Sequence, residues 1–185
     1  ADANRRLLAV SILDLPVSVP PRHPHNINGS FTVVVTTVHD KPAPGSDEVY
    51  RTHDHAWVGD NGYVTREGLR RKYAIAFLGQ MLTAANEVVN QVFLVDLPND
   101  PSALTRAALG MPLEGTPLTR PLPPANVTQR RLTALPRGVA TSQRFWPTSS
   151  ADGRSIAFLA DDVEGVTQLW TTSPCAAPGG EVHLT

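Results

Sequence analysis

The last third of the chain constrains the fold most, because strand-like segments and tight turns alternate there at short intervals. A turn at 149–153 precedes an apolar strand at 155–159, and a second turn at 161–165 precedes another strand at 167–172. A linker rich in proline and glycine then leads to a third short strand at 181–185. With one more strand before the first turn, this pattern predicts a sheet of four strands. Such units are the blades of β-propellers, and each blade buries its faces against its neighbours.

An internal repeat supports the same architecture. Three segments recur in one order, and the pairs are 75–78 with 156–159, 91–93 with 168–170, and 130–133 with 182–185. The first copy carries an insertion before its last segment. In residues 156–159, alternate side chains face opposite sides of the strand, and both sets are apolar. This alternation is typical of a sheet that is stacked between two others.

The rest of the chain favours strands and loops over helices. Seventeen prolines and thirteen glycines interrupt it, and few windows have helical periodicity. The expected elements are strands at 6–13, 30–38, 73–82, 91–97 and 129–133, a short helix at 102–110 capped near Asp100, and a long irregular segment at 40–68.

We therefore predict an all-β fold, in which residues 1–185 form part of a β-propeller of four-stranded blades with long inserted loops. The approximate blades are 1–68, which carries a long loop insertion, 69–133 and 134–185. Since a blade takes about 40–50 residues, the chain supplies two to three of them. The remaining blades would come from the same longer chain or from another chain.

Charge and cysteine content exclude several classes of protein. The 16 Lys and Arg residues nearly balance the 17 Asp and Glu residues, which argues against a nucleic-acid-binding protein. The basic run at 66–72 is a solvated strand entry or a local phosphate site. The single cysteine, Cys175, excludes a disulfide within the chain and a cysteine-rich zinc site. No apolar run approaches the ~20 residues that span a membrane, and both the bacterial cytoplasm and the periplasm stay open as compartments.

Two resemblances follow from these motifs. Residues 149–158, with the later segments 168–170 and 179–185, resemble the repeat of TolB-like propellers, although Ala151 stands where that repeat usually has proline. The wider series of motifs looks like that of bacterial propellers of the YidR type, and its members are 23–24, 41–48, 57–59, 92–98 and 129–133. The resemblance implies a closed ring of blades, of which this chain supplies a middle segment. It implies no reaction.

Histidines and carboxylates concentrate between residues 23 and 57. His23 and His25 are two positions apart, as are His53 and His55, and on a regular strand this spacing puts both imidazoles of a pair on one face. With Asp47, Glu48 and Asp54 nearby in sequence, the histidines predict a candidate site for a divalent metal. The alternative is that these histidines are ordinary surface residues.

A second candidate set would bind a ligand at the mouth of the ring. Asp47 and Glu48 follow a Pro-Gly-Ser turn, where they either cap the turn or point into the mouth toward a cation, an amine or a sugar hydroxyl. Trp57 either stacks on a sugar or peptide or packs over the insertion. Together with His23, these residues form the predicted ligand-binding set.

Three functions remain open from the sequence. The favoured one is a non-catalytic propeller scaffold that binds a protein, peptide or glycan through loops at one mouth. The second is a metal-dependent carbohydrate-active enzyme of the oligogalacturonate-lyase type, which rests on the histidine-rich segment and on analogy of fold. The third is the propeller domain of a prolyl-oligopeptidase-like peptidase. The chain has no Gly-x-Ser-x-Gly nucleophile elbow, so we lean toward a protein that is not an enzyme.

Overall fold

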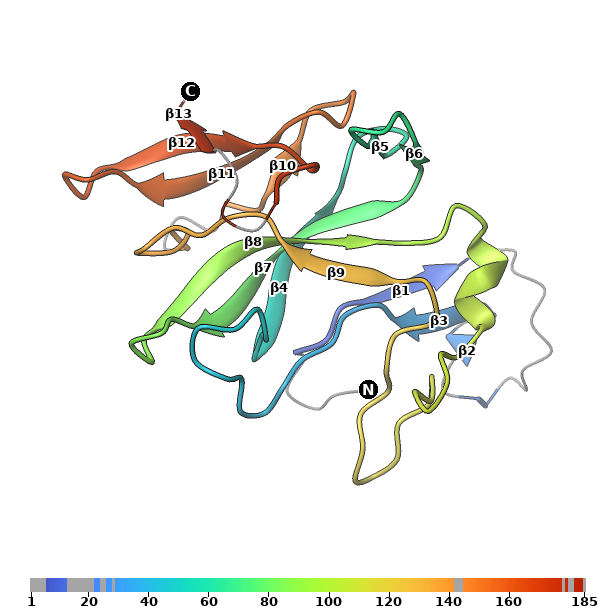
Figure 1. Ribbon diagram of the computed structural model, residues 1–185. Coiled ribbons are helices and arrows are strands. Elements are labelled where there is room, and N and C mark those ends of the chain that lie inside the picture. The colour runs from blue at the N-terminus through green and yellow to red at the C-terminus, as the bar shows by residue number, and fades with distance from the viewer. Residues whose placement is uncertain are drawn as a thin grey trace.

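The computed structural model describes residues 6–12, 22–23, 26–27, 29–141, 145–177, 179 and 182–184. Within these ranges the chain forms thirteen β-strands and one short 3₁₀ helix, which confirms the all-β prediction (Figure 1). No helix in the described ranges is long and apolar enough to cross a membrane.

Three antiparallel sheets and a small hairpin make up the fold. The first sheet has the order β1-β3-β2, with β1 (Ala9–Ile12), β2 (Asn26–Ile27) and β3 (Ser30–Val34). The second has the order β4-β7-β8-β9, with β4 (Arg51–Trp57), β7 (Ala74–Leu82), β8 (Val88–Asp96) and β9 (Thr128–Arg131). The third has the order β10-β11-β12-β13, with β10 (Thr148–Ser149), β11 (Ile156–Asp161), β12 (Thr167–Thr172) and β13 (Val182–Leu184). The hairpin consists of β5 (Tyr63–Val64) and β6 (Arg70–Arg71).

The third sheet confirms the four-stranded unit that the turns predict, although the terminal residues 181 and 185 of the last expected strand lie outside the described ranges. The internal repeat is also present as paired strands. Phe77 lies opposite Phe93 in the second sheet, and Phe158 lies opposite Trp170 in the third. In the last strands, the structural equivalence is shifted by one residue from the sequence match. Arg131 lies opposite Phe93 in the second sheet, whereas Leu184 lies opposite Trp170 in the third.

The expectation of an irregular segment at 40–68 is wrong. This segment contains β4, the first strand of the second sheet, which pairs with β7 from Arg51 to Trp57. Its side chains include histidine, aspartate and arginine, so composition gives little strand signal. Pairing with the apolar β7 supplies the backbone hydrogen bonds instead. The approximate blade boundary at residue 68 falls between these two strands of one sheet.

The expected helix at 102–110 is shorter than predicted and is a 3₁₀ helix, η1 (Pro101–Thr105). Asp100 caps it as expected, because its carboxylate accepts a hydrogen bond from the backbone N–H of Ser102 at 3.0 Å. The helix ends early because Arg106 is already extended, with φ −98° and ψ 116°.

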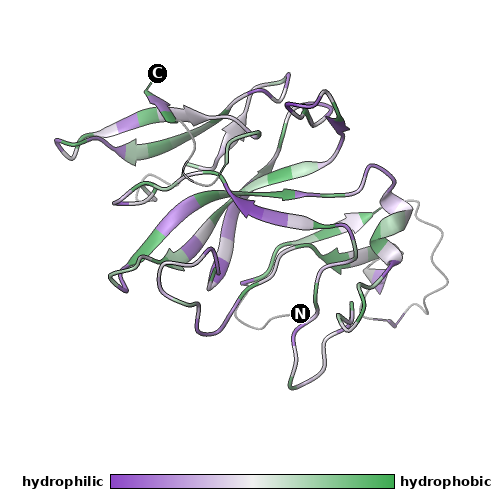
Figure 2. Cartoon of the chain, viewed as in Figure 1, coloured by the Kyte–Doolittle hydropathy of each residue, from purple (hydrophilic) through white to green (hydrophobic). Residues whose placement is uncertain are grey.

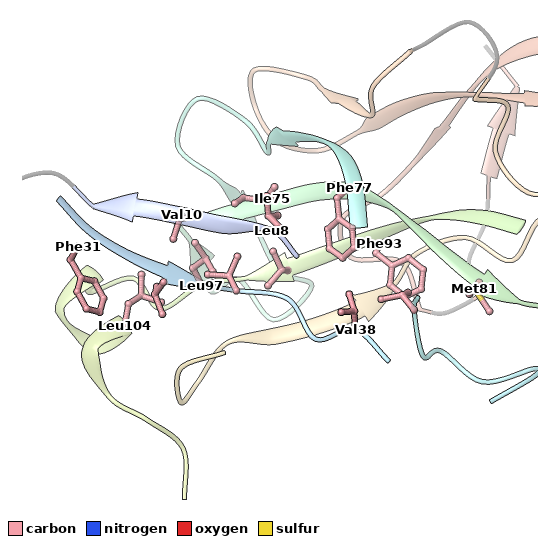
Figure 3. Packing of buried hydrophobic residues seen from close by; sticks show 14 of the residues in the cluster. Leu8, Val10, Phe31, Val38, Ile75, Phe77, Met81, Phe93, Leu97 and Leu104 are labelled. Atoms are coloured by element: carbon pink, nitrogen blue, oxygen red, sulfur yellow. The ribbon is translucent and has the colours of Figure 1, made fainter. Parts of the chain in front are cut away.

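The second sheet lies between the other two and is buried on both faces (Figure 1). Ile75 and Phe77 of β7 pack toward the first sheet, where they meet residues such as Leu8 and Val10 (Figure 3). The alternate residues of β7, among them Ala76 and Leu78, join the cluster of the third sheet. This is the stacking that alternating apolar residues predict, and burying one large apolar side chain stabilises the fold by about 1.5–3 kcal/mol.

The edge of the second sheet is polar. Figure 2 shows hydrophilic residues along β9, in contrast to the largely hydrophobic β7 and β8. Charged side chains on an edge strand disfavour pairing with another chain. In β9 they also reach neighbouring elements, since Arg130 donates to the carbonyl oxygen of Ala176 at 3.0 Å and Arg131 pairs with Asp47 at 3.1 Å.

Candidate functional site

A large cleft lies beside the end of β4, where β1 faces the start of β7. We call it the Trp57 cleft, and its volume is about 820 Å³. Its wall on one side is β1, and on the other side are the loop after β4 and the segment after β8. The lining residues are Val10, Ser11, Ile12, Trp57, Val58, Gly59, Asp60, Asn61, Arg70, Lys72, Tyr73, Leu97, Pro98, Pro101 and Leu104.

Two aromatic side chains dominate this cleft. Trp57 is the last residue of β4, and it lies opposite Ile75 on the face that looks toward the first sheet. Its ring meets Tyr73 edge to face, with centroids 6.5 Å apart and an interplanar angle of 70°. Trp57 remains 54% exposed and Tyr73 38% exposed, so apolar ring surface is open to a ligand.

The backbone that carries Trp57 is fixed to two sheets. The N–H of Val58 donates to the carbonyl of Ala74 at 2.9 Å, which continues the pairing of β4 with β7. The N–H of Gly59 donates to Ser149 Oγ at 2.6 Å, and the N–H of Asp60 donates to the carbonyl of Ala151 at 2.9 Å. The aromatic wall is therefore presented on rigid backbone rather than on a free loop.

The charges of the cleft are unbalanced. Arg70 and Lys72 line it together with a single carboxylate, that of Asp60. Arg70 donates to the carbonyl of Asn61 at 3.2 Å. Among the described residues, Lys72 is bonded only through its backbone N–H, which donates to the side chain of Asn99. Across the described part of the chain, neither cation forms an ion pair. The local charge is therefore positive, which favours an anionic ligand.

The predicted ligand-binding residues are not gathered in this cleft, apart from Trp57. The carboxylate of Glu48 accepts a hydrogen bond from the N–H of Ala43 at 2.8 Å, so it caps its own turn. Asp47 pairs with a β9 arginine, as described above. His23 Nε2 lies 2.8 Å from Glu114 Oε1, on the insertion between β8 and β9. Each of the three is thus engaged at a different place in the fold.

The two histidines predicted to share a face do not do so. A β-bulge at Asp54 shifts the register, so that His53 lies opposite Leu78 and His55 lies opposite Phe77. Leu78 and Phe77 point to opposite faces of the sheet, and the imidazoles follow them. The i, i+2 rule fails here because the extra residue reverses the alternation.

In the described ranges, no group of three His, Cys, Asp or Glu side chains is placed to hold a metal ion. The other predicted pair is His23 and His25, and His25 lies outside those ranges.

Sequence reasoning missed most of the cleft. The basic run at 66–72 indicates Arg70 and Lys72, but nothing in its spacing connects them to Trp57. They meet because the β5–β6 hairpin folds back between the end of β4 and the start of β7. The sequence signal that could have indicated this cleft is a tryptophan and a basic run on either side of a glycine-rich loop.

A known protein shares much of this sequence. Over 172 residues, or 90% of this chain, the sequence is 40% identical to the uncharacterized protein YidR of Escherichia coli (strain K12). This chain is similar to YidR. The similarity supports the YidR-type resemblance of the motifs. The match covers 37% of the length of YidR, so the chain spans well under half of that relative. No family model and no solved structure matches the chain.

Proposed function

We propose that this chain is part of a TolB-like β-propeller of the YidR type, and that it binds an anionic glycan in the Trp57 cleft without catalysing a reaction. The ring would act as a rigid scaffold, and the loops between strands would carry the contacts to the ligand.

The direction of sheet packing supports the propeller. Phe77 and Phe158 occupy equivalent positions in the repeat, and each points toward the sheet that precedes its own. A two-layer sandwich buries opposite faces of its two sheets against each other. Here the second and third sheets each pack the same face against the sheet that precedes them in the chain, as blades do around an axis.

One observation carries the ligand proposal: an exposed tryptophan shares a cleft with two cations that have no ion-pair partner among the described residues. The flat ring of Trp57 offers apolar surface to the C–H face of a sugar. Arg70 and Lys72 offer charge-assisted hydrogen bonds to carboxylates, and such bonds contribute about 1.5–3 kcal/mol each.

Calorimetry with defined hexasaccharides tests this proposal. Hexagalacturonate, which carries one carboxylate per sugar, should bind, and the neutral maltohexaose should bind the Trp57 cleft at least tenfold more weakly. The double variant Arg70→Gln/Lys72→Gln and the single variant Trp57→Ala should each weaken hexagalacturonate binding at least tenfold, which corresponds to about 1.4 kcal/mol.

Tyr50→Ala is the matched control, because Tyr50 is also an exposed aromatic residue, at 39%, and lies outside the Trp57 cleft. This variant should bind hexagalacturonate as the unchanged protein does. Failure of hexagalacturonate to bind, or equal binding of a hexaglutamate peptide, would overturn the proposal.

A further inference from the structure

A second cleft lies toward the opposite end of β4, between the second and third sheets. We call it the Trp146 cleft, and its volume is about 480 Å³. It shares no residue with the Trp57 cleft, and its lining residues are Arg51, His53, Asp54, Gln80, Asn90, Thr141 and Trp146.

A chain of hydrogen bonds fixes the side chains of this cleft. The indole N–H of Trp146 donates to Asp54 Oδ1 at 2.9 Å. The other carboxylate oxygen of Asp54 lies 2.9 Å from His53 Nδ1, and His53 Nε2 lies 2.9 Å from Asn90 Oδ1. Side chains from β4, β8 and the segment before β10 are thereby held in one arrangement before any ligand arrives.

The β-bulge creates this arrangement. Asp54 has a φ of +47°, a left-handed conformation that is unusual for a residue other than glycine. The bulge turns His53 to the face of the sheet that carries Asn90, while His55 takes the opposite face. Bulges often lie next to binding sites because they re-aim side chains in this way.

A purely structural role accounts for only part of the cleft. The bond from Trp146 to Asp54 joins the third sheet to the second, as a clamp would. A clamp does not require that 57% of the tryptophan surface be open. It also does not require the exposed Arg51, whose guanidinium has no ion pair or hydrogen bond to any described residue.

We propose that the Trp146 cleft is a second binding site, for a neutral saccharide. The indole ring is held by its N–H edge, which leaves its apolar face free for the C–H face of a sugar. Amide, hydroxyl and guanidinium groups surround it, from Asn90, Gln80, Thr141 and Arg51. They supply both donors and acceptors, as sugar hydroxyls require.

Charge distinguishes the two clefts. In the Trp146 cleft the arginine is balanced by the carboxylate of Asp54, whereas in the Trp57 cleft two cations face one carboxylate. A balanced, polar cleft gives no advantage to an anion, so a neutral sugar is the better match. This inference is independent of the anionic ligand proposed for the Trp57 cleft.

Calorimetry with maltohexaose, cellohexaose and mannohexaose tests the site. At least one of them should bind with a Kd in the micromolar to millimolar range. Trp146→Ala and Arg51→Ala should each weaken that binding at least fivefold, while Tyr50→Ala, at an exposed aromatic residue that lines neither cleft, should leave it unchanged.

Two further variants separate binding from folding. Arg51→Ala removes an exposed side chain, so its melting temperature should match that of the unchanged protein even as affinity falls. Trp146→Phe keeps an aromatic face but loses the bond to Asp54, and it should retain more affinity than Trp146→Ala. The proposal is overturned if none of the three sugars binds at 10 mM, or if Arg51→Ala and Trp146→Ala both leave affinity unchanged.

Discussion

At the scale of single residues, Tyr63 of β5 links the charged side chains of Asp96 and Arg130. Its hydroxyl donates to Asp96 Oδ1 at 2.8 Å and accepts from Arg130 at 3.1 Å. Burial of the phenol, followed by the negative charge of Asp96, raises the pKa of Tyr63 from 10.0 to about 12. Tyr63 therefore stays neutral in the folded protein at pH values where a free tyrosine ionises.

Alkaline titration should report this pKa. Between pH 10 and 12 the unfolded chain loses the Tyr63 proton and the folded chain keeps it, so the free energy of unfolding falls as the pH rises. The loss from this group should reach about 2–3 kcal/mol at pH 12, because each pKa unit is worth 1.36 kcal/mol. Absorbance at 295 nm should show a tyrosine transition near pH 12 that Tyr63→Phe removes. Loss of a transition near pH 10 in that variant would contradict the prediction.

At the scale of elements, the loop after β4 and the turn before β11 approach each other through glycines. Gly59, Gly62 and Gly153 all have positive φ values, of 61°, 70° and 70°. A Cβ on Gly62 would lie 1.7 Å from the carbonyl oxygen of Arg71, and one on Gly153 would lie 2.1 Å from the carbonyl oxygen of Gly62. Only glycine permits both the conformation and the contact.

Replacing Gly62 by alanine should therefore destabilise the protein by more than about 2 kcal/mol, through backbone displacement and an unfavourable conformation. Urea unfolding measures this. Gly68→Ala is the matched control, because Gly68 has a φ of +82° and no atom within 4 Å of the added Cβ. The control should lose only about 1 kcal/mol. Equal losses in the two variants would show that crowding at Gly62 has no effect.

At the scale of the whole molecule, Arg130 connects the second sheet to the third. From β9 its guanidinium donates to the carbonyl oxygens of Pro174 and Ala176, which follow β12. The same side chain reaches Tyr63 and lies 3.5 Å from Asp96. The side chain of Arg130 is 26% exposed, so much of this network is shielded from water.

Arg130→Met should destabilise the fold by about 2–3 kcal/mol, because it removes the positively charged partner of the Asp96 carboxylate and the donor to two carbonyl groups. Thermal unfolding measures the change. Arg154→Met provides the comparison, since its ion pair with Asp152 is 87% exposed on the arginine side and should matter by less than about 0.5 kcal/mol. A similar melting temperature for both variants would rule out Arg130 as a link between the sheets.

Much of the fold could be predicted from local pattern. The strand at 74–82 and the hairpin of β11 and β12 have apolar residues on both faces and turns with glycine at positive φ, such as Gly153 and Gly165. These signals are local, so a short window of sequence contains them. β4 had no such signal, because its residues are polar and its strand conformation depends on pairing with β7.

The candidate sites depended on the tertiary structure to a greater degree. The sequence alone indicates that the chain is rich in strands, that its unit repeats, and that Trp57 and the basic run are candidates for contact with a ligand. Only the tertiary structure decided that a bulge separates His53 from His55 and joins His53 to Trp146 through Asp54. The physical reason is that strand patterns are set by neighbours in sequence, whereas a cleft is made by side chains that meet only after sheets have paired and stacked.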